Sequence, residues 1–299
     1  MTWLQLRLDT NPASAPKLED ALLEIGAAAV TMEDNADQPV YEPGVGETPM
    51  WQQTRVTGLF TADTDMDATL IALESLFGEA LPPNRSEILE DRDWIREWMD
   101  SYHPIQCGER LWICPSWREP VDPSAVNLLL DPGLAFGTGT HPTTWLCMQW
   151  LDQQNLDGLT VIDYGCGSGI LGIAALLLGA KKVIAIDNDP QALTATRDNA
   201  QRNNIDDSRI DCLLPEQIPA NLHGHVMVAN ILAGPLISLA PNLAACLDAD
   251  APICLSGILN TQAEELLKCY RQWFNTLELT AKDEWVRING VKNPLNPNQ

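Results

Sequence analysis

Several features are scarce in this sequence of 299 residues, and each shortage excludes a class of protein. No run of eighteen or more apolar residues occurs, and the N-terminus MTWLQLRLDT lacks a basic start with a long apolar core. The sequence therefore predicts neither a membrane span nor a signal peptide. The eight cysteines form no CxxC pair and only four histidines are present, which excludes a disulfide framework and a zinc site. We expect a cytoplasmic protein without a bound metal.

Positive charge is scarce as well. Eighteen Lys and Arg stand against forty-one Asp and Glu, which gives a net charge of −23 and disfavours direct binding of nucleic acid. Residues 1–100 hold six basic and twenty acidic residues, so more than half of the excess lies in the first third. This acidity serves either solubility alone or the docking of a basic macromolecule.

The first 90 residues carry two similar patterns of strand and helix. TWLQLRL alternates like a strand, and Leu18, Leu22 and Ile25 follow at helical spacing before Gly26. A second strand-like run, AAVTM, comes next. The same order of strand, helix and strand then recurs as VTGLF, an apolar helical face and SEILE. Strand, helix, strand, strand, helix, strand is the order of a ferredoxin-like α/β domain. It contains no cofactor motif, so we expect residues 1–90 to form a substrate-recognition domain.

A connecting helix and linker is expected over residues 91–125, because Trp94 and Trp98 lie one helical turn apart. From residue 126 to 299, apolar strand-like runs alternate with helical ones, which predicts a parallel sheet covered on both faces. The runs LELTAKDEWV and RINGVK have no helix between them and predict a closing antiparallel hairpin.

The run VIDYGCGSGILG places glycines 165, 167 and 169 directly after a strand. In an open parallel sheet, ligands bind beyond the carboxyl ends of the strands. Glycine allows a backbone turn of positive φ and close approach of a ligand. The spacing GxGxxG from Gly167 to Gly172 is weak support for dinucleotide binding, and a turn that only packs a helix on a strand is the alternative.

Two carboxylates near this loop argue for a cationic ligand. Asp163 precedes the loop by two residues and would repel a pyrophosphate, and no Lys or Arg lies in the loop. Asp187 ends the next strand, where an acid accepts hydrogen bonds from both ribose hydroxyls. The alternative for Asp187 is a helix cap, since Asp189 and Pro190 follow. A ribose acceptor without a phosphate contact indicates S-adenosyl-L-methionine.

Two further segments agree with that ligand. DPGLAFGTGTHPTT, residues 131–144, is a glycine-rich loop before a helix start, where Thr143 or Thr144 can offer a hydroxyl to a carboxylate. His141 is a candidate base, although its place before Pro142 favours a structural role. ANILAGP puts Asn230 just past a strand, where its amide oxygen can accept a hydrogen bond from a substrate amine. A turn residue is the alternative for Asn230.

VIDYGCGSGIL, AIDNDPQAL, ANILAGPL and DPGLAFGTGTHPTT, with the leading α/β domain and the WIREWM connector, resemble the PrmA family of bacterial methyltransferases. The resemblance covers essentially the whole chain. It implies a class I methyltransferase domain with a Rossmann-like, mostly parallel sheet over residues 126–299. Asn230 is then both catalytic and cofactor-binding. The other expected cofactor contacts are Thr144, Gly165, Asp187, Asp163, Gly167, Phe136 and Thr138.

The resemblance also implies the reaction and the partner. The family methylates the N-terminal α-amine and lysine ε-amines of large-subunit ribosomal protein eleven, up to trimethyl groups, and the leading domain grips this basic substrate. We expect a monomer. The base that deprotonates the amine stays open among His141, Asn230 and bulk water. The alternative functions are an NAD-linked oxidoreductase, which needs phosphate donors near Gly167, and an inactive module that binds the cofactor.

Overall fold

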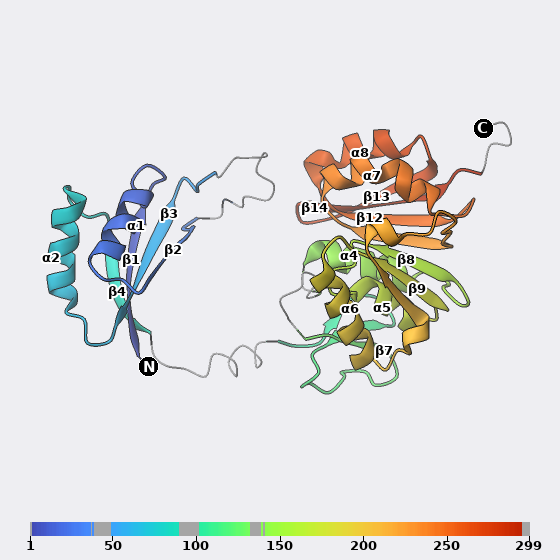
Figure 1. The fold of residues 1–299 in the computed structure, drawn as a ribbon, viewed down its shortest axis with the longest axis horizontal. Coiled ribbons are helices and arrows are strands. Elements are labelled where there is room, and N and C mark those ends of the chain that lie inside the picture. The colour runs from blue at the N-terminus through green and yellow to red at the C-terminus, as the bar shows by residue number, and fades with distance from the viewer. Residues whose placement is uncertain are drawn as a thin grey trace. The chain divides into compact units, whose positions relative to one another are not determined.

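The computed structural model describes residues 2–36, 38, 49–89, 102–131, 139 and 141–294. The chain divides into two compact units, Met1–Met99 and Asp100–Gln299, each of which has its own core (Figure 1). Within the described ranges, no helix is both long enough and apolar enough to cross a membrane. The expected helix around Trp94 and Trp98 lies outside these ranges.

The first unit has the predicted ferredoxin-like fold. Its elements are β1 (Trp3–Thr10), α1 (Ala15–Glu24), β2 (Ala29–Asp34), β3 (Thr54–Thr61), α2 (Met66–Phe77) and β4 (Asn84–Leu89). The strands pair antiparallel in the order β2-β3-β1-β4. Leu6, Leu8, Val56 and Phe60 point to one face of this sheet and form a core with both helices. No described helix of this unit covers the opposite face.

The second unit is built on the predicted mostly parallel sheet. Its strands are β8 (Thr160–Tyr164), β9 (Lys182–Ile186), β10 (Ile210–Leu213), β11 (Val226–Asn230), β12 (Pro252–Leu259), β13 (Phe274–Lys282) and β14 (Trp285–Lys292). They lie in the order β10-β9-β8-β11-β12-β14-β13, and β14 alone is reversed, running antiparallel to both of its neighbours, β12 and β13. From β8 the chain adds strands on one side as far as β10, and it then adds β11 and β12 on the other side of β8. Ligands bind in such folds at this change of strand order, between β8 and β11.

Helices cover both faces of this sheet, so its central strands are buried (Figure 1). One face packs on α4 (Pro142–Asp152), α5 (Ile170–Leu177) and α6 (Pro190–Arg202), and the other packs on α7 (Ala233–Ala245) and α8 (Ala263–Tyr270). Short 3-10 turns occur at Asp207–Arg209, Pro215–Gln217 and Asn260–Gln262. Burial on both faces explains why the strands read as continuous apolar runs without alternation.

A small three-stranded sheet precedes the large one, and its first two strands were not expected from the sequence. It consists of β5 (Ile105–Gln106), β6 (Leu111–Cys114) and β7 (Val126–Leu129) in that order. Leu111 and Ile113 of β6 are buried in the same core as α4 and α5. The segment 91–125, expected as helix and linker, therefore includes two strands of the second unit.

The closing hairpin is present, but its turn lies earlier than the sequence pattern suggested. We placed the break between Val286 and Arg287, whereas the structure turns at Asp283 and Glu284. Asp283 adopts a positive φ of 55°, which aspartate tolerates better than most residues. Trp285 and Val286 thus belong to the second strand of the hairpin, where both are buried.

Candidate functional site

Three of the predicted site residues meet at one edge of the large sheet. Gly165 follows β8, Asp187 follows β9, and Asn230 ends β11. Strand β8 pairs in parallel with both of the others, so the three strands end at the same level. The topology therefore places a glycine turn, a carboxylate and an amide side by side, as the sequence predicted.

The glycine loop is fixed to the end of the neighbouring strand. The N–H groups of Gly165 and Cys166 both donate to the carbonyl of Ile186, at 2.7 and 3.0 Å. Gly165, Gly167 and Gly169 have φ values of 76°, 55° and 77°, a region that side chains with a Cβ rarely adopt. Glycine is required in this turn because the backbone is left-handed three times within five residues.

Gly165 is held tightly against the segment that follows β11. A Cβ at this position would lie 2.2 Å from Cγ2 of Ile231, beside Asn230. We expect Gly165→Ala to lower the free energy of unfolding by about 2–4 kcal/mol, through backbone strain and overpacking. Urea unfolding measures this loss. Gly234→Ala is the matched control, since a Cβ there meets nothing within 4 Å, and equal effects of the two changes would contradict the proposed packing.

Asp187 is half-buried beside the loop and already shapes it. Its Oδ2 accepts the N–H of Gly167 at 2.9 Å, and its Oδ1 accepts the N–H of Asp189 at 3.0 Å. Each carboxylate oxygen has a further lone pair, so these bonds leave acceptors for two hydroxyls. The helix cap of α6 is supplied by Asp189, whose Oδ1 accepts the N–H of Gln191 at 2.8 Å. Asp187 is therefore not needed as the cap.

Asp163 lies beneath the loop and is only 1% exposed. Its Oδ2 accepts the N–H of Gly172 in α5 at 2.8 Å, and its Oδ1 has no hydrogen-bond partner among the described residues. Burial raises the pKa of Asp163 to about 7, opposed by the Gly172 bond and increased by the charge of Asp187. Its contact with a cofactor remains a prediction, because the carboxylate faces α5.

The raised pKa of Asp163 gives a test in pH. The folded protein holds this proton up to about pH 7, whereas the unfolded chain loses it near 3.8, so stability falls as pH rises between these values. Asp163→Asn removes this loss, which is on the order of 4 kcal/mol. We expect the unfolding free energy of the variant, relative to wild type, to increase from pH 4 to pH 8 in urea titrations. A constant difference across this range would show that Asp163 is ionised throughout.

Asn230 faces Thr144 across the edge of the sheet. Its Nδ2 donates to Oγ1 of Thr144 over a long 3.4 Å, and Thr144 is fully buried in the first turn of α4. Oδ1 of Asn230 is buried and finds no hydrogen-bond donor among the described residues. A buried amide oxygen without a donor is costly, and a donor on a ligand would satisfy it.

His141 acts as the N-cap of α4. Its Nδ1 accepts the N–H of Thr143 at 3.3 Å and lies 2.7 Å from the Thr143 hydroxyl. The ring packs edge-on against Trp285, with ring centres 4.8 Å apart, and burial lowers the pKa of His141. These contacts support the structural role that its position before Pro142 indicated.

The glycine-rich segment before α4 is described only in part. Phe136 and Thr138, two of the expected cofactor contacts, lie outside the described residues. Gly139 is described and buried, with φ of 83°, and a Cβ there would meet Ile113 at 2.4 Å and Ile170 at 3.4 Å. Since Ile170 begins α5, the end of this segment lies next to the glycine loop.

Three buried polar side chains, two of α6 and one of the residue that caps its end, support the site and were missed in the sequence. Oγ1 of Thr196 donates to the carbonyl of Gly167 at 3.1 Å, and Nδ2 of Asn199 donates to the carbonyl of Ser168 at 2.8 Å. Asn203 exchanges two hydrogen bonds of 2.8 Å with the backbone of Leu129, just before the glycine-rich segment. Their spacing of three and four residues on one helix face was the available signal.

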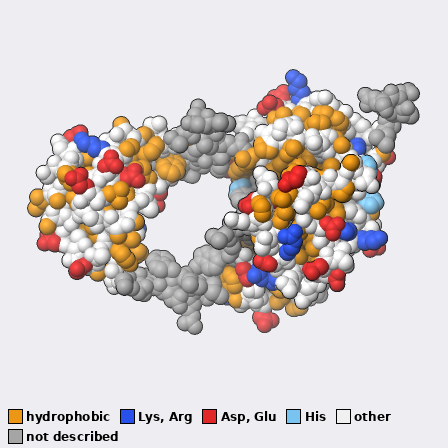
Figure 2. Space-filling view, viewed as in Figure 1, with side chains coloured by type: hydrophobic (Ala, Val, Ile, Leu, Met, Phe, Trp, Pro, Cys, Tyr) orange, Lys and Arg blue, Asp and Glu red, His pale blue; other side chains and the backbone are white. Residues whose placement is uncertain are grey.

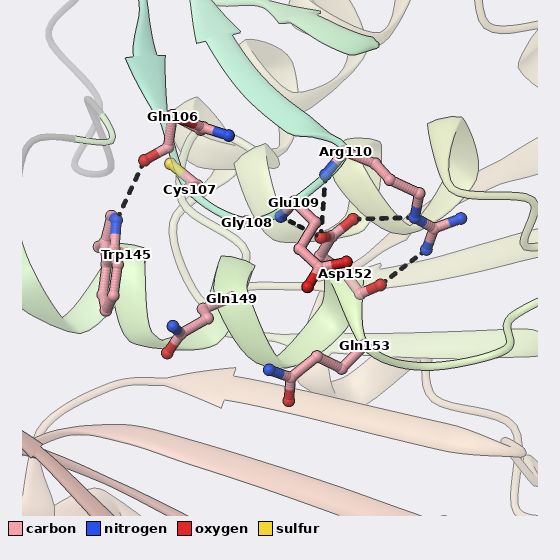
Figure 3. Close-up of a pocket in the computed structure, with 9 residues that line it drawn as sticks. All are labelled: Gln106, Cys107, Gly108, Glu109, Arg110, Trp145, Gln149, Asp152 and Gln153. Carbon is pink, nitrogen blue, oxygen red and sulfur yellow. Dashed lines mark hydrogen bonds and ion pairs between the residues drawn. The ribbon is translucent and has the colours of Figure 1, made fainter.

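A separate hollow of about 570 Å³ lies between α4 and the turn joining β5 to β6 (Figure 3). Its buried Asp152 accepts the N–H groups of Glu109 and Arg110 at 2.7 and 3.2 Å and pairs with the Arg110 guanidinium. Trp145 donates its indole N–H to the carbonyl of Gln106 at 3.2 Å. These bonds fasten the turn to α4. None of the expected site residues that the structure describes lines this hollow, so we assign its polar groups a structural role.

Comparisons with known proteins agree with the motifs. The family model "Ribosomal protein L11 methyltransferase (PrmA)" matches residues 2–293. Ribosomal protein L11 methyltransferases of Cellvibrio japonicus (strain Ueda107) and Marinomonas sp. (strain MWYL1) are each 55% identical, over 98% of this chain and 99% of theirs. A crystal structure of ribosomal protein L11 methylase from Lactobacillus delbrueckii subsp. bulgaricus matches with a TM-score of 0.58 at 34% identity, covering 64% of this chain and all of that chain. The chain belongs to the PrmA family of ribosomal protein L11 methyltransferases.

Proposed function

We propose that this chain is an S-adenosylmethionine-dependent N-methyltransferase of ribosomal protein L11. It modifies the N-terminal α-amine and lysine ε-amines up to trimethyl groups. The observation that carries the proposal is the sheet edge at which Gly165, Asp187 and Asn230 meet without a basic residue in the loop. The names of the relatives point to the substrate.

The residues present fit this cofactor in charge and in hydrogen bonding. Asp187 offers carboxylate acceptors to the ribose, and residues 161–172 contain no Lys or Arg that would favour a phosphate. Thr144 stands at the N-terminal turn of α4, where a carboxylate is stabilised by the helix dipole. S-adenosylmethionine supplies an activated methyl group on a positively charged sulfur. The same features disfavour the NAD-linked oxidoreductase.

The protein's part in the reaction is alignment and exclusion of water. Oδ1 of Asn230, which has no donor among the described residues, accepts an N–H of the substrate amine, and this leaves the nitrogen lone pair directed at the methyl carbon. The amine must be neutral, and removing the proton from a lysine at pH 7 costs about 4–5 kcal/mol. Since Nδ1 of His141 is engaged with Thr143, bulk water takes the proton in this proposal.

We further propose that the chain works as a monomer in the cytoplasm, without direct contact to nucleic acid or membrane. Residues 1–90 grip the substrate, residues 91–125 connect, and residues 126–299 hold the cofactor. Deletion of residues 1–90 should abolish methylation of L11 while S-adenosylhomocysteine still binds, and unaffected methylation would give this domain another role.

Incubation with labelled S-adenosylmethionine and purified L11, followed by mass analysis, tests the proposed reaction. We expect mass gains in steps of one methyl group, at the N-terminus and at lysines. A second basic ribosomal protein serves as the control and should stay unlabelled. Binding of NAD without binding of S-adenosylhomocysteine in calorimetry would favour the oxidoreductase instead.

A further inference from the structure

Charge in the first unit is divided between its two faces. The open face of the sheet carries the ion pairs Arg55–Asp9, Arg55–Glu33, Arg7–Glu87 and Arg85–Glu87, with N···O distances of 2.7, 3.9, 3.1 and 3.3 Å. All three described arginines of this unit thus lie on one face and are matched there by carboxylates. Among the described residues, the charges of these ion pairs balance, so this face offers no net negative charge to a strongly basic partner, and separating the pairs would leave charges unpaired.

The helix face has the opposite character. Helices α1 and α2 and the turns beside them hold one lysine, Lys17, which pairs with Glu79 at 3.5 Å. The acidic residues of the same layer are Glu19, Asp20, Glu24, Asp63, Asp65, Asp67, Glu74 and Glu79. The acidic excess predicted for the first third of the chain is therefore concentrated, among the described residues, on the helices.

Apolar side chains stand exposed among these acids. Ile71 of α2 is 71% exposed and lies on the same helix face as Asp67 and Glu74, at spacings of four and three residues. Leu23 of α1 is 49% exposed, and Leu76 of α2 is 43% exposed. Figure 2 shows acidic and apolar side chains interspersed over this unit. An apolar surface rimmed by charge is typical of a protein interface.

We propose that the outer face of α1 and α2, on which Leu23, Ile71 and Leu76 are exposed among acidic residues, is the surface that docks the basic substrate protein. This proposal rests on the proposed function and adds which face of the first unit makes the contact. The exposed acids attract the partner and fix its orientation, and the apolar side chains are buried on docking. The open sheet face stays outside the interface.

Two matched double variants test the docking face. Ala68→Lys with Ala72→Lys adds two positive charges to the exposed side of α2, and Ala29→Lys with Thr31→Lys adds two to the open face of the sheet. All four residues are exposed, so both variants should fold. We expect the helix variant to raise the KM and the Kd for L11 about tenfold, and the sheet variant less than about twofold. Neither should change kcat or the affinity for S-adenosylhomocysteine.

Ile71→Gln tests the contribution of apolar contacts to L11 binding separately from that of charge. It should weaken L11 binding about tenfold, with little dependence on salt, whereas the effect of the helix lysines should shrink at high salt. Calorimetry with purified L11 reads docking directly, so it does not depend on turnover. If both lysine variants raised the Kd for L11 equally, or if the sheet variant raised it more, the proposed docking face would be wrong. Binding of L11 without methylation would refute the proposed function and leave the docking face standing.

Discussion

Asp187→Ala is expected to weaken binding of S-adenosylhomocysteine at least about 100-fold. Two charge-assisted hydrogen bonds to the ribose are lost, each of which contributes roughly 1.5–3 kcal/mol. The variant also releases the N–H of Gly167, which the carboxylate holds at 2.9 Å, so the glycine loop loses an anchor. Titration calorimetry with S-adenosylhomocysteine, which binds without turnover, measures the change in Kd.

Asp189→Ala is the matched control for this prediction. It removes the same charge two residues away, together with the cap on Gln191 at 2.8 Å, which costs about 1 kcal/mol of stability. Since Asp189 is exposed and caps α6, its loss should change the Kd less than about threefold. If both variants weakened binding equally, the effect would be one of net charge, and the assignment of Asp187 to the ribose would fail.

The fold was predictable where elements are long. Parallel strands buried on both faces appear as apolar runs, and most of them are separated by a helical run, so the parallel direction of β8 to β12 follows from the pattern, whereas their order in the sheet was not predicted. Strands β5 and β6 have two and four residues, which is too short for a period to be read. The hairpin turn was misplaced because WV resembles the end of one strand, whereas the positive φ of Asp283 is a feature of the folded chain.

The site was predictable as far as topology determines it. Residues that follow parallel strands meet at one edge, which brought Gly165, Asp187 and Asn230 together. The spacing of the polar residues along α6 was a signal that they share one face, but their partners could not be predicted, because Asn203, directly after α6, bonds to Leu129 across 74 positions of sequence. The burial of Asp163 behind the loop also depends on the packing of α5, which spacing in the sequence does not reveal.

Asn230→Ala is expected to lower kcat for L11 methylation about 100- to 1,000-fold, a larger effect than on the affinity for S-adenosylhomocysteine, which loses only one of the cofactor contacts that the resemblance implies. The methyl of alanine cannot accept the N–H of the amine, so the nitrogen loses its orientation toward the methyl carbon. Stability should not fall, because the buried Oδ1 has no partner in the part of the chain that the structure describes, and the Nδ2 contact with Thr144 spans 3.4 Å. Single-turnover kinetics and thermal unfolding together measure the two effects.

Asn289→Ala separates this role from packing. Asn289 of β14 also has a buried Oδ1 without a partner among the described residues, but this residue lies opposite Cys254 of β12 in the interior of the sheet. Both variants remove a buried amide oxygen that lacks a hydrogen-bond donor among the described residues, but only Asn230→Ala should lose activity. A large loss of kcat in both would indicate that the sheet itself was distorted. An unchanged kcat in Asn230→Ala would show that this amide does not align the amine, and the proposed mechanism would then lack its central contact.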